Sequence, residues 1–374
     1  MNAARTGEGE PRRSGFADAL RGFALVGICV VNLPWLASSP PGERSGLDDA
    51  ARLLVALLFE GKFFVLFSLL FGFGFQRQLA RAGGGAAGSY ARRLAGLFAL
   101  GALHAVLLFV GDILATYALL GALLWAVRRL PDARLLALAG LCALIAAAAF
   151  ALLAWVYTGD HDAAAVAADE AAARRAYLGS FAEALARRLQ DLPGAAVTVL
   201  LFNWPLAFGA FCLGLVAGRR GLLDDPARLA GVLPPVRWLV AGALVGNLAA
   251  AAAYRLPGGW VVAAYALLAL GAPCLAALYA LALARAWGIP RSRAWMEAWL
   301  VPGGRMSLSN YLGQSVAANL LLAGWGFGLY GSLGAAALLA LALAIAGTGL
   351  ALSSVWLRRF RAGPAERMLR AWAR

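Results

Sequence analysis

The chain has 374 residues, of which 62% are hydrophobic and 14% are charged, and its mean hydropathy is +0.74. Ordinary globular domains have about 45–50% apolar and about 25% charged residues, so this composition excludes a soluble globular protein. The formal net charge is +14, but the basic residues lie in short runs between apolar blocks and form no nucleic-acid-binding motif. We therefore expect a multi-pass membrane protein whose partner is the lipid bilayer and not a nucleic acid.

Ten apolar blocks have the length that a helix needs to cross about 30 Å of hydrocarbon. They cover residues 19–37, 62–79, 94–110, 113–130, 135–157, 196–217, 237–254, 260–284, 305–324 and 333–356. Residues 47–59 are a shorter and more mixed segment, which we expect to lie at the outer interface. The sequence thus predicts an all-α, polytopic transmembrane helical bundle of ten spans, with residues 1–374 forming one integral membrane domain.

The distribution of basic residues predicts the orientation of the bundle. Of the 33 basic residues, 24 lie in one alternating set of connecting segments, which includes both chain ends, and seven lie in the opposite set. Cytoplasmic segments carry the excess of Lys and Arg in membrane proteins. Both termini are therefore expected in the cytoplasm, and the polar N-terminal segment before the first span indicates an uncleaved anchor.

The longest connecting segment, residues 158–195, is expected outside the cytoplasm. Its Ala-rich run 163–189 predicts one amphipathic helix on the outer surface, which favours a solvated cover over a functional site. The four cysteines lie at wide spacing inside apolar blocks. They indicate packing residues, and neither a disulfide framework nor a metal site is expected.

The first span carries a polar stripe. Asp18 and Arg21 are spaced i, i+3 and can pair across one helical turn. Arg21 and Asn32 are eleven residues apart, so they share a helix face and are separated by roughly 16 Å along the axis. An interfacial ion pair with a packing Asn would explain this pattern, but a polar cavity explains it better.

A second polar group surrounds His104, which lies in the outer half of its span. Asp112 follows eight residues later, in an outer turn before Tyr117. A lone intramembrane His often only hydrogen-bonds another helix, yet a group that titrates near pH 7 suits proton transfer. Lys62 is the only lysine of the chain. It could line the same cavity or anchor the outer interface together with Glu60.

The span 305–324 holds seven polar side chains in thirteen residues, more than helix packing alone explains. They are Ser307, Ser309, Asn310, Tyr311, Gln314, Ser315 and Asn319. Ser307, Asn310 and Gln314 follow i, i+3, i+7 and share a face. We expect this helix to line a wet cavity, with Arg305 at its cytoplasmic end placed for an anionic group.

Five ordered blocks of the chain resemble the bacterial YeiB family, a family of multi-pass membrane proteins. The blocks are DALRGFALVGICVVN, KFFVLFSLLFGFGF, RRLAGLFALGALHAVLLFVGDILATYALLG, GGRMSLSNYLGQS and WLRRFRAGPAERMLRAW. The resemblance implies a bacterial cytoplasmic (inner) membrane location. It also implies a relation to transmembrane acyltransferases such as heparan-α-glucosaminide N-acetyltransferase, which pass an acyl group from cytosolic acyl-CoA to an acceptor on the other face. In that enzyme a reactive His lies between the first two spans. It has no counterpart here, because residues 38–60, between the first two predicted spans, contain no His.

The resemblance leads to a transmembrane acyltransferase as the first functional hypothesis. Acyl-CoA would bind through its phosphates to Arg21 and Arg305, and its pantetheine arm would pass Asn310 and Gln314. His104 would act as general base on a hydroxyl or amine acceptor, and Asp112 would orient it. Asn32, Lys62, Tyr117 and Tyr311 are further candidate binding residues, and no metal is expected.

Two other functions remain open at this point. A transporter or channel for a small polar solute would use the same cavity without chemistry, and a scaffold would need no ligand. The chain could also form a homo-oligomer. Basic residues on one side do not separate these functions, because the positive-inside rule predicts them for any membrane protein.

Overall fold

The computed structural model describes residues 14–37, 46–82, 86–157, 163–253 and 260–373, and in these ranges the chain is helical without β-strands. The helices are α1 (Gly15–Ala37), α2 (Gly46–Leu58), α3 (Lys62–Ala82), α4 (Ala86–Leu107), α5 (Leu114–Val127), α6 (Asp132–Tyr157), α7 (Ala163–Leu178), α8 (Phe181–Thr198), the π-helical turn η2 (Val199–Asn203), α9 (Trp204–Arg219), α10 (Pro226–Val232), α11 (Val236–Ala253), α12 (Trp260–Trp287), α13 (Pro290–Arg305), α14 (Ser307–Leu322), α15 (Ala335–Arg359) and α16 (Pro364–Trp372).

Each of the ten apolar blocks overlaps a helix, so the predicted all-α helical bundle is confirmed. Among the described residues, five helical units are long and apolar enough to cross a membrane, and seven if two bent pairs each count as one span. Helices α5 and α14 are shorter, with 14 and 16 residues. The count of ten spans therefore stays a prediction.

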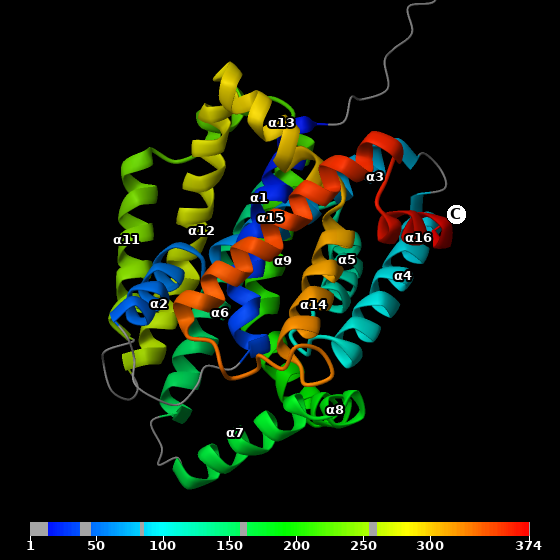
Figure 1. Ribbon diagram of the computed structural model, residues 1–374. Coiled ribbons are helices and arrows are strands. Elements are labelled where there is room, and N and C mark those ends of the chain that lie inside the picture. Colours follow the sequence, from blue (N-terminus) through cyan, green and yellow to red (C-terminus); the bar gives the residue numbers. More distant parts are fainter. Residues whose placement is uncertain (1–13, 38–45, 83–85, 158–162, 254–259, 374) are drawn as a thin grey trace, which may run out of the picture.

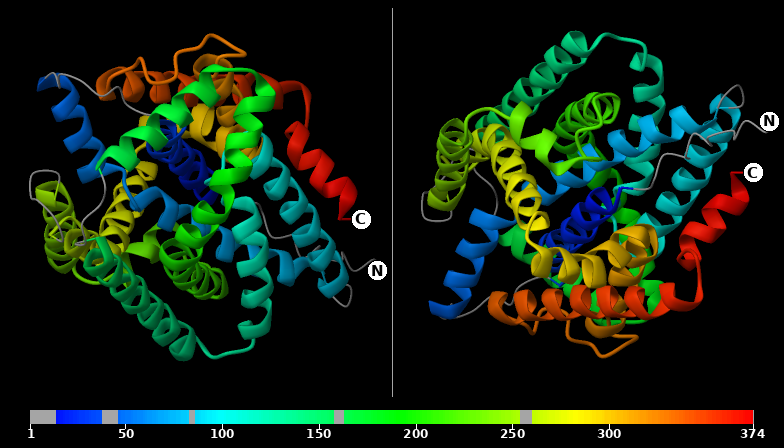
Figure 2. Two further views of the ribbon diagram at one scale, coloured as in Figure 1. Left: turned by 90° about the horizontal axis from the view of Figure 1, so that it is seen from below. Right: turned by 90° about the horizontal axis from the view of Figure 1, so that it is seen from above.

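Helix α1 lies near the centre of the bundle, as both views along the bundle show (Figure 2). Fourteen of its 23 residues are buried. Helix α13 lies across one end of the bundle, and α7 and α8 lie across the opposite end (Figure 1). Under the predicted orientation, α13 marks the cytoplasmic end and α7 with α8 the outer end.

Close contact between α3 and α9 holds the core together. A Cβ atom on Gly72 would collide with the carbonyl oxygen of Phe211, and one on Gly214 would collide with that of Leu69. Small residues let helix backbones approach in this way inside a membrane. Beside this contact the rings of Phe71 and Phe211 stack with centroids 4.5 Å apart.

The outer segment differs from the single helix expected over residues 163–189, because it forms two helices, α7 and α8. The break falls at Gly179 and Ser180. Ser180 accepts a hydrogen bond from the Glu183 backbone, and the Glu183 side chain accepts one from the Ser180 backbone. This capping box starts a new helix and ends the old one. We call residues 163–198 the outer hairpin.

Residues 47–59, expected at the outer interface, form α2, which continues through a turn at Gly61 into α3. Together they make one apolar helical unit of 35 residues, Gly46–Ala80. At 1.5 Å per residue this unit is roughly 50 Å long, which exceeds the hydrocarbon thickness of about 30 Å. The length allows part of the unit to lie outside the hydrocarbon, and the interfacial position of α2 stays a prediction.

Candidate functional site

The central feature of the site is a series of hydrogen bonds that joins Asp112, His104 and Ser315, which we call the buried triad. The Nδ1 atom of His104 lies 2.8 Å from Oδ1 of Asp112, and its Nε2 atom lies 2.9 Å from Oγ of Ser315. The three residues are 5%, 2% and 5% exposed, respectively. When Nδ1–H donates to the carboxylate, Nε2 is left free to accept the hydroxyl proton of Ser315.

Three separate elements bring the triad together. His104 lies in the last turn of α4, Asp112 in the turn before α5, and Ser315 in the middle of α14. The second oxygen of Asp112 accepts a hydrogen bond of 2.8 Å from the backbone N–H of Ala115, in the first turn of α5. The start of α5 thus fixes the carboxylate that orients the imidazole.

Tyr311 supports the triad from one helical turn below Ser315. Its ring centroid lies 5.0 Å from that of His104. Its hydroxyl accepts a hydrogen bond of 3.3 Å from the backbone N–H of Ile113. Tyr311, Ser315 and Asn319 follow each other at i, i+4 and i+8, so they form one face of α14 directed at α4 and its following turn.

The other expected residues of α14 point elsewhere. Asn310 donates hydrogen bonds to the Gly303 carbonyl and to Ser353 Oγ, at 3.0 and 2.8 Å. Gln314 donates to the Leu25 carbonyl of α1 at 3.3 Å. The structure thus divides the polar residues of α14 between two faces, and does not gather His104, Asn310 and Gln314 around one shared cavity.

The polar residues at the start of α1 lie at the α13 end of the bundle, far along α1 from Asn32. Arg21 forms the predicted ion pair with Asp18 at 2.7 Å and also donates to the Leu70 carbonyl. The positive charges of Arg21 and Arg93 repel each other, and Arg93 donates to Gln78 at 2.9 Å. Asn32 is half-buried.

The remaining candidates fall into different surroundings. Lys62 is completely buried and donates from Nζ to the Ala56 carbonyl at 2.6 Å, near the end of α2. Tyr117 is buried with its hydroxyl 2.6 Å from Ser68 Oγ. Arg305 reaches the Arg361 carbonyl at 3.5 Å, near the start of α16. Within the part of the chain that the structure describes, no three metal-ligating side chains are grouped to hold an ion.

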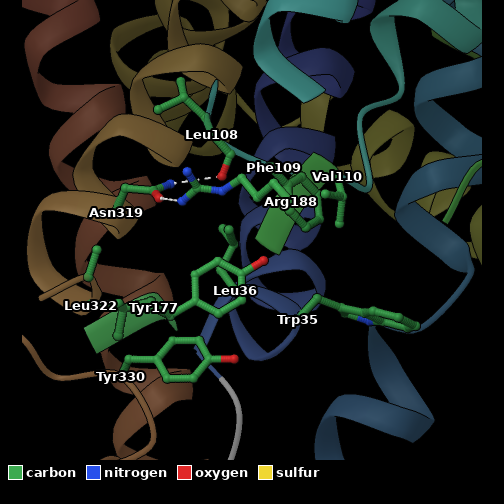
Figure 3. Close-up of a pocket in the computed structure, with 11 residues that line it drawn as sticks. Trp35, Leu36, Leu108, Phe109, Val110, Tyr177, Arg188, Asn319, Leu322 and Tyr330 are labelled. Atoms are coloured by element: carbon green, nitrogen blue, oxygen red, sulfur yellow. Dashed lines mark hydrogen bonds between the residues drawn. The ribbon is translucent and has the colours of Figure 1, made fainter. Parts of the chain in front are cut away.

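Arg188 of the outer hairpin is a site residue that the sequence reasoning missed. It is 2% exposed. Its guanidinium donates to the Leu107 carbonyl at 2.8 Å. It also donates to Asn319 Oδ1, as Figure 3 shows. It lines a pocket of about 30 Å³ next to the triad, together with Trp35, Phe109, Tyr177, Asn319 and Tyr330, which we call the outer pocket. In the sequence Arg188 directly follows the charged Arg187 in a polar segment, and this position does not predict that its side chain is buried.

The outer hairpin is held over this pocket by its own ion pairs and by the loop after α14. Arg187 pairs with Asp169 at 2.8 Å and with Asp191 at 2.9 Å. Hydrogen bonds from Arg187 hold the pKa of the Asp169 carboxyl below its usual range. The backbone N–H of Gly324 donates to the Tyr177 carbonyl at 2.9 Å. The hairpin therefore covers the pocket and contributes Arg188 to its interior.

Comparison with known proteins places the chain in a family. The model described as "Protein of unknown function (DUF418)" matches residues 217–374. Uncharacterized protein YxaH of Bacillus subtilis is 31% identical, and the alignment covers 96% of this chain and 94% of that protein. Uncharacterized protein YeiB of Escherichia coli is 29% identical, with 93% of each chain covered. No solved structure matches. The chain belongs to the YeiB-like DUF418 family of bacterial proteins.

Proposed function

We propose that this protein is a transmembrane acyltransferase that passes an acyl group from a cytosolic acyl-CoA to a hydroxyl or amine acceptor at the outer face. The observation that carries the proposal is the buried triad, in which a carboxylate, an imidazole and a hydroxyl follow each other at hydrogen-bond distance. This is the geometry by which a base activates an oxygen nucleophile. His104 and Ser315 alone would be enough for a hydrogen bond between two helices. Asp112 adds a carboxylate on the other side of the imidazole, which orients the ring and stabilises its charged form during proton transfer.

The reaction divides into two displacements. In the first, Ser315 Oγ attacks the thioester carbon and His104 Nε2 takes the hydroxyl proton. The C–S bond then breaks, and the thiolate leaves with the proton from His104. In the second, the acceptor attacks the Ser315 ester, His104 takes the acceptor's proton, and the Ser315 oxygen regains it as the ester bond breaks. Asp112 orients the imidazole and stabilises its charged form.

The opposite end of the bundle supports the binding of an anionic donor. Arg21 and Arg93 lie close enough for their positive charges to repel each other, and the ion pair with Asp18 balances only one of the two charges. Guanidinium groups bind phosphate oxygens well. The phosphates of acyl-CoA, the donor that the family resemblance implies, suit this place. The donor would then approach Ser315 along the bundle from the cytoplasmic side, and the acceptor from the side of the outer hairpin.

The test is to trap the acylated serine. The purified full-length protein in nanodiscs is incubated with acetyl-CoA labelled in the acetyl group, denatured, and examined for label that hydroxylamine releases. We expect the label on the peptide containing Ser315. The Ser315→Ala variant should carry none, and Ser353→Ala should be labelled like the wild type, because Ser353 is equally buried but contacts Asn310 instead of His104.

Two results would overturn the proposal. One is a wild-type protein that takes up no label, which is what a carrier of small polar solutes predicts. The other is a Ser315→Ala variant labelled to the same extent as the wild type, which would place the acyl group on a different residue.

A further inference from the structure

We propose that Arg188 and the outer pocket bind an anionic group of the acceptor, so that the substrate carries a carboxylate or phosphate close to its reacting hydroxyl or amine. The identity of this ligand as the acceptor rests on the proposed acyl transfer. The presence of an anion subsite rests on the pocket alone.

The first observation is a buried positive charge. Arg188 is 2% exposed, and in the ranges that the structure describes no Asp or Glu carboxylate forms an ion pair with it. Its two hydrogen-bond acceptors there, the Leu107 carbonyl and the Asn319 amide oxygen, are both neutral. Leu107 ends α4, and a helix C-terminus offers only about half a negative charge. A buried cation of this kind favours binding of an anion.

The second observation is the space beside that charge. The outer pocket has a volume of about 30 Å³, which is room for about two water molecules that an anion could displace. The stacked rings of Tyr177 and Tyr330, with centroids 4.9 Å apart, form its floor. Trp35 at its rim is 77% exposed, so the pocket lies near the surface. Figure 3 shows Arg188 and Asn319 on one side of it and the two tyrosines on the other.

The third observation is the distance between the pocket and the triad. Asn319, which lines the pocket, lies four residues from Ser315 on α14, a rise of about 6 Å. Phe109 lines the pocket and also contacts the His104 ring edge-on, at 6.3 Å between centroids. A substrate whose anionic group is held by Arg188 would therefore bring a hydroxyl or amine, a few bonds away from that group, to the Ser315 ester. Hydroxy acids, amino acids and glycerophosphate groups have this spacing.

The subsite can be tested by binding, without turnover. The full-length protein in phosphatidylcholine nanodiscs is titrated with sn-glycerol 3-phosphate, and with glycerol as the uncharged counterpart, while tryptophan fluorescence is recorded. We expect saturable binding of the phosphate and none of glycerol at the same concentrations. Arg188→Gln should weaken binding at least tenfold, whereas Arg175→Gln, which removes an exposed charge from the same hairpin, should change it less than twofold.

A second variant serves if Arg188→Gln does not fold. Asn319→Asp keeps the shape of the side chain and puts a carboxylate where Arg188 already donates. This internal counter-charge should abolish phosphate binding. Wild-type affinity in a folded Arg188→Gln or Asn319→Asp variant, or no saturable binding by the wild type, would overturn the subsite.

Competition separates a lipid head group from a soluble anion as the source of the ligand. Displacement of the probe by dihexanoyl-phosphatidylglycerol, but not by dihexanoyl-phosphatidylcholine, would support a lipid acceptor. Binding that neither lipid displaces would support a soluble one. Arg188-dependent binding with no label on Ser315 would overturn acyl transfer and leave the anion subsite standing. Labelled Ser315 without anion binding would overturn the anion subsite and leave acyl transfer standing.

Discussion

At the scale of single residues, the buried triad is the most informative feature of a chain that is otherwise apolar. A charged residue at the centre of a membrane helix costs about 2.5–3.5 kcal/mol on insertion scales. Asp112 reduces this cost by hydrogen-bonding His104 and the Ala115 backbone. These hydrogen bonds stabilise the fold and also orient His104 as a base. Substitutions must therefore separate the effect on stability from the effect on proton transfer.

His104 gives the sharpest separation. His104→Gln can keep one hydrogen bond but cannot transfer a proton, so we expect the acyl transfer per folded molecule to fall by about 10²- to 10⁴-fold. His104→Ala should lose as much activity and also lower the yield. Asp112→Asn should cost less, because that carboxylate orients the ring and stabilises its charged form but takes no proton itself. The measurement compares the variants with the wild type in one nanodisc preparation. Near-normal activity in His104→Gln would make His104 a packing residue.

At the scale of elements, the outer hairpin depends on close contact with the loop after α14. A Cβ atom on Gly324 would collide with the Leu178 carbonyl of α7. Gly324→Ala should therefore push the hairpin off the bundle, at a cost of roughly 1–3 kcal/mol. Trypsin should then cleave faster at the exposed Arg175. Gly313→Ala is the control, because no atom lies near that Cβ position and Ala favours a helix. If trypsin cleaves the Gly324→Ala and Gly313→Ala variants at equal rates, the contact between Gly324 and Leu178 does not hold the hairpin on the bundle.

The contact between α7 and α8 should depend on pH. Because the hydrogen bonds from Arg187 lower the pKa of Asp169 below its ordinary value of 3.8, the pair stabilises the hairpin above that pH. The contribution is lost as the pH falls through the lowered pKa. Hydrogen exchange in α7, corrected for intrinsic rates, should therefore rise below about pH 4 and not at neutral pH. Asp169 is mostly exposed, so high salt should weaken the effect. If the Asp169→Asn variant shows the same rise in exchange at acid pH, the Arg187–Asp169 pair is not its cause.

The sequence predicts the elements better than the site, for a physical reason. Backbone polar groups inside a membrane must bond within the segment, so an apolar block of sufficient length is a helix. The break at Ser180 was also readable, since Ser180 and Glu183 have the spacing of a capping box. The pairing of His104 with Ser315 joins residues 211 positions apart. No helical periodicity determines which faces of α4 and α14 meet, and the same holds for Arg188 and Asn319.

At the scale of the whole molecule, the proposed function requires a fixed orientation. The outer hairpin and α13 cover opposite ends of the bundle (Figure 1). The 24 basic residues of one set of connecting segments, against seven of the other, predict that the hairpin faces outward. Only then does the acceptor meet the outer pocket while the donor meets Arg21 and Arg93.

This orientation can be measured with single cysteines and a membrane-impermeant maleimide. Ala171→Cys lies on an exposed position of α7, and Arg370→Cys on an exposed position of α16. In intact spheroplasts we expect labelling at residue 171, and labelling at residue 370 only after the membrane is opened. The wild-type protein, with its own four cysteines, gives the background. Labelling at residue 370 alone would place the hairpin in the cytoplasm. Arg188 and its pocket would then face the donor side, and the anion that they bind would belong to the acyl donor instead of the acceptor.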